Sequence, residues 1–96
     1  MYARDVSIHL KPTSLALFNE KLAKEVMPLL RKQKGFRSIV TFSDVSGTHV
    51  TTISLWDTEA HADQYSASGY PQVLRVLQPV INYTETAERG NCMVMV

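Results

Sequence analysis

The stretch from His49 to Trp56 constrains the fold more than any other, because its apolar residues do not keep to one face of a strand. In an extended chain, Ile53 and Leu55 point to one side. Val50 and Trp56 point to the other side. A sheet that is apolar on both faces needs a covering layer on each of them. We therefore expect an α+β domain in which helices cover one face of the sheet and a second copy of the chain covers the other.

Two periodicities place the first strand and the first helix. Residues 5–10 alternate between polar and apolar side chains, which is typical of a strand with one buried face. Apolar residues at helical spacing then predict a helix over residues 15–31, with a kink or a fresh short helix at Pro28, which has no amide hydrogen. Gly35 can take the left-handed conformation that often ends a helix.

Residues 37–56 are typical of a β-hairpin, because two stretches rich in β-forming residues flank the turn sequence Asp-Val-Ser-Gly at 44–47. A second helix follows, and we expect it to reach about Tyr65. The sequence Ser-Ala-Ser-Gly at 66–69 predicts a break in that helix. Pro71 suits the first turn of a third helix.

The remaining segment completes the sheet. We expect a strand over residues 80–87, a turn over 88–91 and a short apolar strand over 92–96. The resulting order β-α-β-β-α-β is the split βαβ arrangement of ferredoxin-like folds. Residues 1–96 are thus predicted to form a single ferredoxin-like α+β domain with a four-stranded antiparallel sheet, a broken second helix and an extra C-terminal strand that could cross to the partner.

Composition excludes several classes of protein. The net charge of +1 gives no electrostatic footprint of a nucleic-acid binder, and no apolar run approaches the ~20 residues of a membrane span. The single cysteine, Cys92, rules out an internal disulfide. This cysteine usage suits a reducing cytoplasm, where we expect the protein. We expect the thiol to be inert, because it belongs to an apolar predicted strand. The three histidines lie far apart in the sequence, so we predict no metal site.

Three short stretches carry a family resemblance: Gly-Phe-Arg-Ser at 35–38, Ser-Gly-Thr at 46–48 and Trp-Asp-Thr-Glu-Ala at 56–60. In this order and spacing they resemble the antibiotic biosynthesis monooxygenase family of dimeric α/β barrels. The resemblance covers about half of the chain. It implies a homodimer with a pocket for a small aromatic molecule between sheet and helices. The family includes cofactor-independent oxygenases that convert polycyclic phenols or anthrones to quinones, and haem-degrading enzymes.

Two of the four pocket residues that the resemblance implies for the oxygenases are present. Trp56 stands where the family has a tryptophan ending the third strand, and Arg75 where it has an arginine on the later helix. Thr52 replaces an asparagine and Ala62 replaces a tyrosine, so the sequence departs from the family pattern at these two positions. The haem-degrading reading is weaker, because the helix that would supply a histidine ligand has no histidine at 73–76.

The candidate catalytic residues are Trp56, Arg75 and His9. Trp56 could form a flat apolar wall for an aromatic ligand, or could simply be a core residue. Arg75 could stabilise an anion in a dry pocket, although Gln72 and Gln78 at helical spacing favour a solvated face. His9 carries an imidazole that could act as a base, or could be a hydrogen-bonded bystander.

The candidate substrate-binding residues are small or aromatic. Thr52 and Ser54 share the parity of Trp56, and small side chains facing a helix layer leave room for a cavity. The other candidates are Ser7, on the polar face of the first strand, and Tyr65 and Tyr70, which flank the predicted helix break.

The leading hypothesis is a homodimeric oxygenase that acts on a quinol-type aromatic molecule with neither metal nor flavin. The alternative is a non-catalytic dimeric binding or stress-response module that keeps the pocket. RNA binding on the sheet would need paired aromatic residues on the central strands, and Ser7, His9, Thr52 and Ser54 occupy those positions instead.

Overall fold

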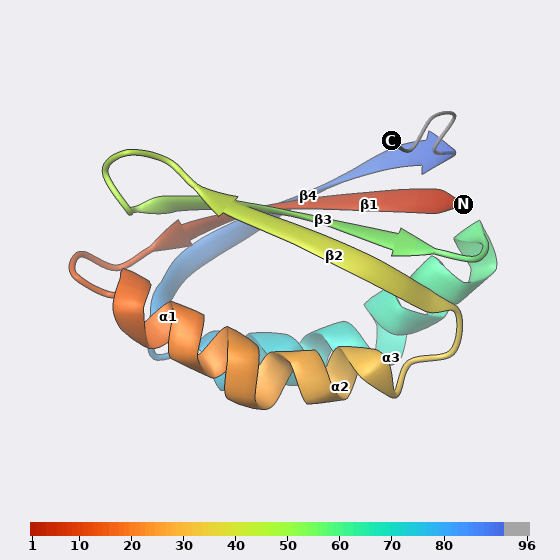
Figure 1. Cartoon of the computed structure of the whole chain (residues 1–96), viewed down its shortest axis with the longest axis horizontal. Coiled ribbons are helices and arrows are strands. Elements are labelled where there is room, and N and C mark those ends of the chain that lie inside the picture. Colours follow the sequence, from red (N-terminus) through yellow and green to blue (C-terminus); the bar gives the residue numbers. More distant parts are fainter. Residues whose placement is uncertain (92–96) are drawn as a thin grey trace.

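A four-stranded antiparallel sheet is covered by helices on one face only (Figure 1). The computed structural model describes residues 1–91, without the side chains of 87–89 and 91. The strand order is β2-β3-β1-β4, which confirms the predicted ferredoxin-like arrangement. The elements are β1 (Tyr2–Leu10), α1 (Leu15–Lys21), the π-helical turn η1 (Leu22–Val26), α2 (Met27–Arg31), β2 (Phe36–Ser43), β3 (His49–Trp56), α3 (Glu59–Leu77) and β4 (Ile81–Asn91).

The register of the sheet decides which side chains meet the helices. Tyr2 pairs with Trp56, and Arg4 pairs with Ser54, so that these alternate residues of β1 and β3 share one face. Every second residue of β3, beginning with Val50, is buried under the helices. The core between the layers also contains Phe18, Val26, Leu30, Val73 and Leu77.

The first helical segment changes its hydrogen-bonding pattern before Pro28. The chain runs as α1, passes through the π-helical turn η1, and continues as α2 with Pro28 in its first turn. Because proline has no amide hydrogen, a fresh helical start is the least costly way to hold it. This confirms the second of the two predicted outcomes at Pro28.

α3 is continuous, so the predicted break over residues 66–69 is wrong. Tyr65, Val73 and Leu77 are all buried, and packing on both sides of the predicted break maintains the helix. Gly69 serves close packing instead, because a Cβ atom there would lie 2.7 Å from Cδ1 of Tyr65 and 2.9 Å from Cδ of Gln33.

The turn predicted over residues 88–91 is also absent, because β4 continues to Asn91. Ala3 pairs with Gly90 and Arg4 with Glu88, so the register skips one residue of β4. Gly90, next to the skipped residue, has φ +86°, and a glycine with positive φ at such a point is typical of a β-bulge. The strand predicted over 92–96, with Cys92, lies outside the described residues.

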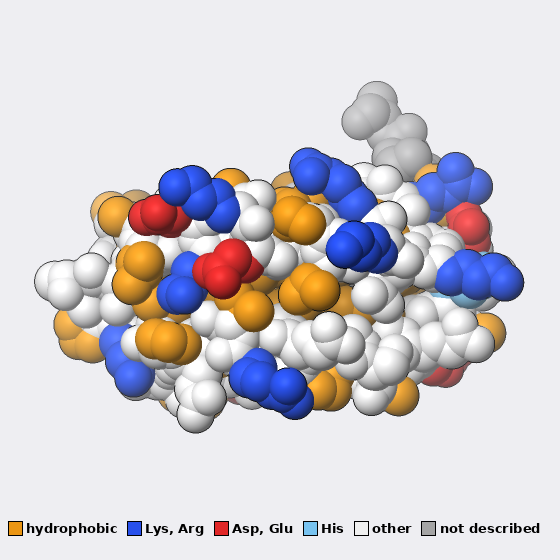
Figure 2. Space-filling view, turned by 90° about the horizontal axis from the view of Figure 1, so that it is seen from below, with side chains coloured by type: hydrophobic (Ala, Val, Ile, Leu, Met, Phe, Trp, Pro, Cys, Tyr) orange, Lys and Arg blue, Asp and Glu red, His pale blue; other side chains and the backbone are white. Residues whose placement is uncertain are grey.

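The face of the sheet away from the helices carries apolar side chains on its outer strands. Val40 and Phe42 of β2 are 57% and 52% exposed, and Tyr83 of β4 is 54% exposed. Ile53 and Leu55 of β3 lie on the same face and are half-buried. The two-sided apolar character predicted for the sheet is therefore confirmed. The outer surface of the helices instead carries charged side chains of both signs (Figure 2).

Replacing Gly35 by alanine is expected to cost about 2–4 kcal/mol of the free energy of unfolding. Gly35 has φ +82°, and an added Cβ atom would lie 2.3 Å from Cγ of His61. Urea denaturation measures the loss. Gly90→Ala is the matched control, because φ is +86° and nothing among the described residues lies within 4 Å of the added atom. Equal losses in the two variants would contradict the steric part of this account.

Candidate functional site

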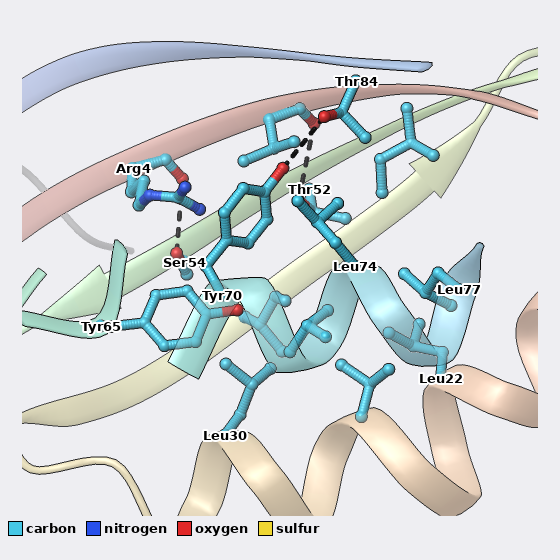
Figure 3. Close-up of a pocket in the computed structure, with 15 residues that line it drawn as sticks. Arg4, Leu22, Leu30, Thr52, Ser54, Tyr65, Tyr70, Leu74, Leu77 and Thr84 are labelled. Carbon is cyan, nitrogen blue, oxygen red and sulfur yellow. Dashed lines mark hydrogen bonds between the residues drawn. The ribbon is translucent and has the colours of Figure 1, made fainter. Parts of the chain in front are cut away.

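A cavity lies between the sheet and the helices, under β1, β3 and the edge strand β4 (Figure 3). Aliphatic side chains from β1, η1, α2 and α3 form most of its wall. The free volume inside is about 40 Å³, which is room for about three water molecules. A larger ligand therefore requires lining side chains to move. The polar or aromatic lining residues are Arg4, Thr52, Ser54, Tyr65, Tyr70 and Thr84.

Arg4 brings a positive charge into this cavity. Its side chain extends from the helix-facing side of β1, and the residue is 5% exposed. Its Nε donates a hydrogen bond to Oγ of Ser66 at 2.9 Å. Its guanidinium carbon lies 4.2 Å from the centre of the Tyr70 ring and 5.4 Å from that of Tyr65. Two electron-rich ring faces and a hydroxyl thus hold the guanidinium in place.

A row of aromatic rings leads from the sheet to the cavity. Trp56 is fully buried and stacks on Tyr65, with ring centres 4.8 Å apart. Tyr65 is in turn 6.0 Å from Tyr70. Tyr70 donates from its hydroxyl to Oγ1 of Thr84 at 3.2 Å, a hydrogen bond that links α3 to β4 (Figure 3). Trp56 therefore supports the cavity wall through Tyr65 and is not itself among the described lining residues.

The small polar residues of β3 are already hydrogen-bonded within the sheet. Thr52 and Ser54 both line the cavity, as predicted for their parity, but their hydroxyls donate to backbone carbonyls of β1 at 3.5 Å. Oγ of Ser54 also accepts from Nε1 of Trp56 at 3.0 Å. The two hydroxyls therefore already make hydrogen bonds to the backbone of β1, and the Ser54 hydroxyl also makes one to Trp56. We expect them to contribute little to the binding of a ligand.

Burial raises the pKa of the Tyr65 phenol from 10.0 to about 12, and the charge of Arg4 opposes that rise. The folded protein therefore holds this proton more tightly than the unfolded chain does. The resulting stability is complete below pH 10 and is lost as the pH rises toward 12. At neutral pH Tyr65 is a neutral phenol that can donate a hydrogen bond.

Tyr65→Phe should therefore reduce the loss of stability at alkaline pH. Between about pH 9 and pH 11 the unfolding free energy of the wild type should fall by about 1.3 kcal/mol more than that of the variant. Urea denaturation across this range checks the difference. Parallel curves for the two proteins would contradict the assigned burial of the phenol.

Three of the predicted site residues lie away from the cavity. Ser7 and His9 lie on the opposite face of the sheet, where His9 stacks on Tyr83 and contacts the carboxylate of Glu85 at 3.1 Å. Arg75 is exposed on the outer side of α3, beside shallow open grooves. The structure thus brings together Thr52, Ser54, Tyr65 and Tyr70, with Trp56 behind them, and leaves the other three outside.

Arg4 and Thr84 are the polar lining residues that sequence reasoning missed. For Arg4 a signal existed, because it has the same parity as Val6, Ile8 and Leu10 on the apolar side of the first strand. A charged residue in a buried register position is an informative exception. Thr84 shares the helix-facing parity of β4, but nothing in its own sequence context distinguishes it.

The described residues include neither a cluster of metal ligands nor a helix suited to span a membrane. Across residues 1–91, no three His, Cys, Asp or Glu side chains come together in a group that could hold a metal ion. No helix in this part of the chain is both long enough and apolar enough to cross a bilayer.

Comparison with solved structures finds other proteins with the same fold. A protein of unknown function from Nitrosomonas europaea, NE2512, matches with a TM-score of 0.80 and 13% identity, over 99% of this chain and 92% of that chain. SnoaB, a cofactor-independent oxygenase from Streptomyces nogalater, matches with a TM-score of 0.79 and 12% identity, over 98% and 95%. A monooxygenase from the gene ActVA-Orf6 of Streptomyces coelicolor, in complex with Nanaomycin D, matches with a TM-score of 0.76 and 17% identity, over 99% and 90%.

At these identities the structural matches establish the fold alone. No curated protein matches the chain. The model of the antibiotic biosynthesis monooxygenase family matches residues 1–76, which include the first three strands and nearly all of the helical layer. The chain therefore belongs to the antibiotic biosynthesis monooxygenase family.

Proposed function

We propose that the protein is a cofactor-independent oxygenase that acts on a small aromatic molecule of quinol or anthrone type in the cavity under the sheet. The observation that carries this proposal is an apolar cavity with one buried guanidinium, that of Arg4, between two tyrosine rings. Tyr65 and Tyr70 contact the substrate in this proposal, and Trp56 fixes their position. The family match supports the reaction class.

The residues suit a reaction in which the substrate supplies the electrons. An apolar cavity excludes water and strengthens the attraction between Arg4 and a phenolate or enolate. The anion can then pass electrons to dioxygen. In the overall step on an anthrone, a methylene group loses two hydrogens and gains one oxygen atom as a carbonyl, and the second oxygen atom leaves as water. A quinol instead gives two electrons and two protons to dioxygen, which yields the quinone and hydrogen peroxide. The balance needs no oxidant other than dioxygen.

Oxygen uptake with a panel of anthrones and quinols tests this proposal. From an anthrone, enzyme-dependent uptake should give one quinone per dioxygen consumed and no hydrogen peroxide, whereas a quinol should give quinone and hydrogen peroxide in equal amounts. Anaerobic incubation of the same mixture should give no quinone. A ligand that demonstrably binds in the cavity without oxygen uptake from any member of the panel would count against the oxygenase.

That negative result would favour a second candidate, a non-catalytic ligand-binding module of the same fold. One specific observation supports it. Among the described lining residues there is no histidine, aspartate or glutamate, and the Tyr65 phenol keeps its proton at neutral pH. A neutral substrate would therefore meet no general base in the described part of the cavity.

We also propose that the protein works as a homodimer through the face of the sheet that the helices leave uncovered. Three large apolar side chains there, Val40, Phe42 and Tyr83, are more than half exposed. A second copy would bury them against the same residues, since a twofold interface presents one patch to itself. Ser7 and His9 would then lie at or near the interface, because they occupy this face.

A further inference from the structure

The cavity contains a positive charge that the described residues do not neutralise. Arg4 is 5% exposed, and none of the described lining residues is a carboxylate. Arg4 takes part in none of the ion pairs found among the described side chains. A buried charge is costly unless it is paired, because it has lost its hydration. Among the described residues, the site is therefore short of a negative partner.

The surroundings orient the guanidinium without neutralising it. Arginine has five N–H donors, and Nε uses one of them on Ser66. The terminal nitrogens donate to no other described residue. The rings of Tyr65 and Tyr70 face the cation, but their attraction is weaker than that of a carboxylate. Figure 3 shows Arg4 beside Tyr70 at the polar end of the cavity, where an oxyanion could accept from both terminal nitrogens.

The same lining contains no group that could create the anion in place. Its described members have no imidazole or carboxylate side chain, so a neutral weak acid would have to lose its proton to solvent rather than to a described lining residue. An acid that is ionised in solution needs no base. Its charge would also supply the negative partner that Arg4 lacks among the described residues.

We propose that this cavity selects a planar aromatic molecule that is already an anion at neutral pH, an acidic enol or an aromatic carboxylate, and holds its oxyanion on Arg4. The inference rests on the proposed function for its choice of site, but not on the oxidation step. The aliphatic wall receives the ring, and Tyr65 and Tyr70 flank the charged end. Ser66 is a positioning residue, because it reaches a ligand only through Arg4.

The test compares 2-naphthoate with 2-naphthamide, a neutral molecule of nearly the same shape, by isothermal titration calorimetry at neutral pH. Neither compound is a quinol, so binding is measured apart from turnover. The acid should bind about 10- to 100-fold more tightly, as expected for charge-assisted hydrogen bonds. Equal affinities in the wild type would overturn the proposal without any variant.

Variants locate the selectivity. In Arg4→Gln the preference for naphthoate should disappear. Arg4→Lys keeps the positive charge but loses the paired N–H donors of the guanidinium, so it should keep part of the preference. Arg31→Gln removes an exposed arginine of α2 and should leave the preference unchanged. A preference that survives in folded Arg4→Gln, or is lost in Arg31→Gln, would place the anion elsewhere and overturn the assignment.

One further variant asks whether the chain supplies its own counter-ion. Glu88 is the residue opposite Arg4 in the register of β1 and β4. Glu88→Gln should leave the affinity for naphthoate within about threefold, and a rise of about tenfold or more would mean that a resident charge competes with the ligand and would overturn the proposal.

The two proposals fail in distinguishable ways. Selective binding of naphthoate with no oxygen uptake from any quinol supports the anion site and counts against the oxygenase. Oxygen uptake from neutral quinols with no preference for naphthoate supports the oxygenase and overturns the anion site.

Discussion

Replacing Arg4 by glutamine is expected to lower kcat/KM for oxygen uptake by about 10²- to 10³-fold, the usual effect of removing one donor to a developing oxyanion. The reason is its position, since Arg4 is the one cation among the described residues that line the cavity. Arg75→Gln is expected to leave kcat/KM unchanged, because that side chain is exposed on the far side of α3. The measurement uses whichever member of the anthrone and quinol panel gives the fastest uptake.

The pair of variants decides between two assignments of the anion-binding residue. If Arg75→Gln loses activity and Arg4→Gln keeps it, the assignment from the family resemblance is right and the one from cavity geometry is wrong. Loss of activity in Arg4→Gln counts only for folded protein. Trp56 is the sole tryptophan and stacks on Tyr65, so its fluorescence reports whether the wall of the cavity is intact.

The two arginines also show what the sequence could and could not specify. The first strand alternates cleanly from Asp5 to Leu10, and extending that parity by one step would have placed Arg4 on the same face as Val6 and Ile8. The placement of Arg75 depends on the rotation of α3 about its own axis, and the sequence predicted that this helix would be broken. Because α3 is continuous, Val73 and Leu77 face the core, and Arg75 faces solvent.

Pairing across the sheet explains why some site predictions held and others did not. The parity of β3 correctly assigned Thr52, Ser54 and Trp56 to one face, since side chains alternate strictly along a strand. Parity alone did not say which face of β1 meets the helices. That depends on the register with β3, in which Arg4 pairs with Ser54 and places Ser7 and His9 on the opposite face.

The predicted break in α3 failed for a different reason. Gly69 and Pro71 are both unfavourable inside a helix, and local propensity alone favours a stop there. Packing overrides it, because Tyr65 on one side and Val73 on the other are both buried against the sheet. The free carbonyl that Pro71 leaves belongs to Ala67, which is exposed to water. The cost of the proline is therefore small at this position.

The largest effect on assembly is expected from Phe42→Asp. Phe42 lies on the uncovered face of the sheet and is 52% exposed. Burying a phenylalanine contributes about 1.5–3 kcal/mol, and a twofold interface counts the change twice. The loss of about 3–6 kcal/mol should raise the Kd of the dimer by about 10²- to 10⁴-fold. Sedimentation velocity over a concentration series measures this Kd.

Val45→Asp is the matched control for charge. Val45 is fully exposed in the turn between β2 and β3, so the same substitution there should leave the dimer intact. If the wild-type protein sediments as a monomer at micromolar concentration, the proposed homodimer is wrong. If Phe42→Asp dimerises as tightly as the wild type, a different surface joins the copies, and the apolar strands β2 and β4 are covered in some other way. The proposed interface and the cavity lie on opposite faces of one sheet, so a folded monomeric Phe42→Asp variant should still prefer naphthoate over naphthamide.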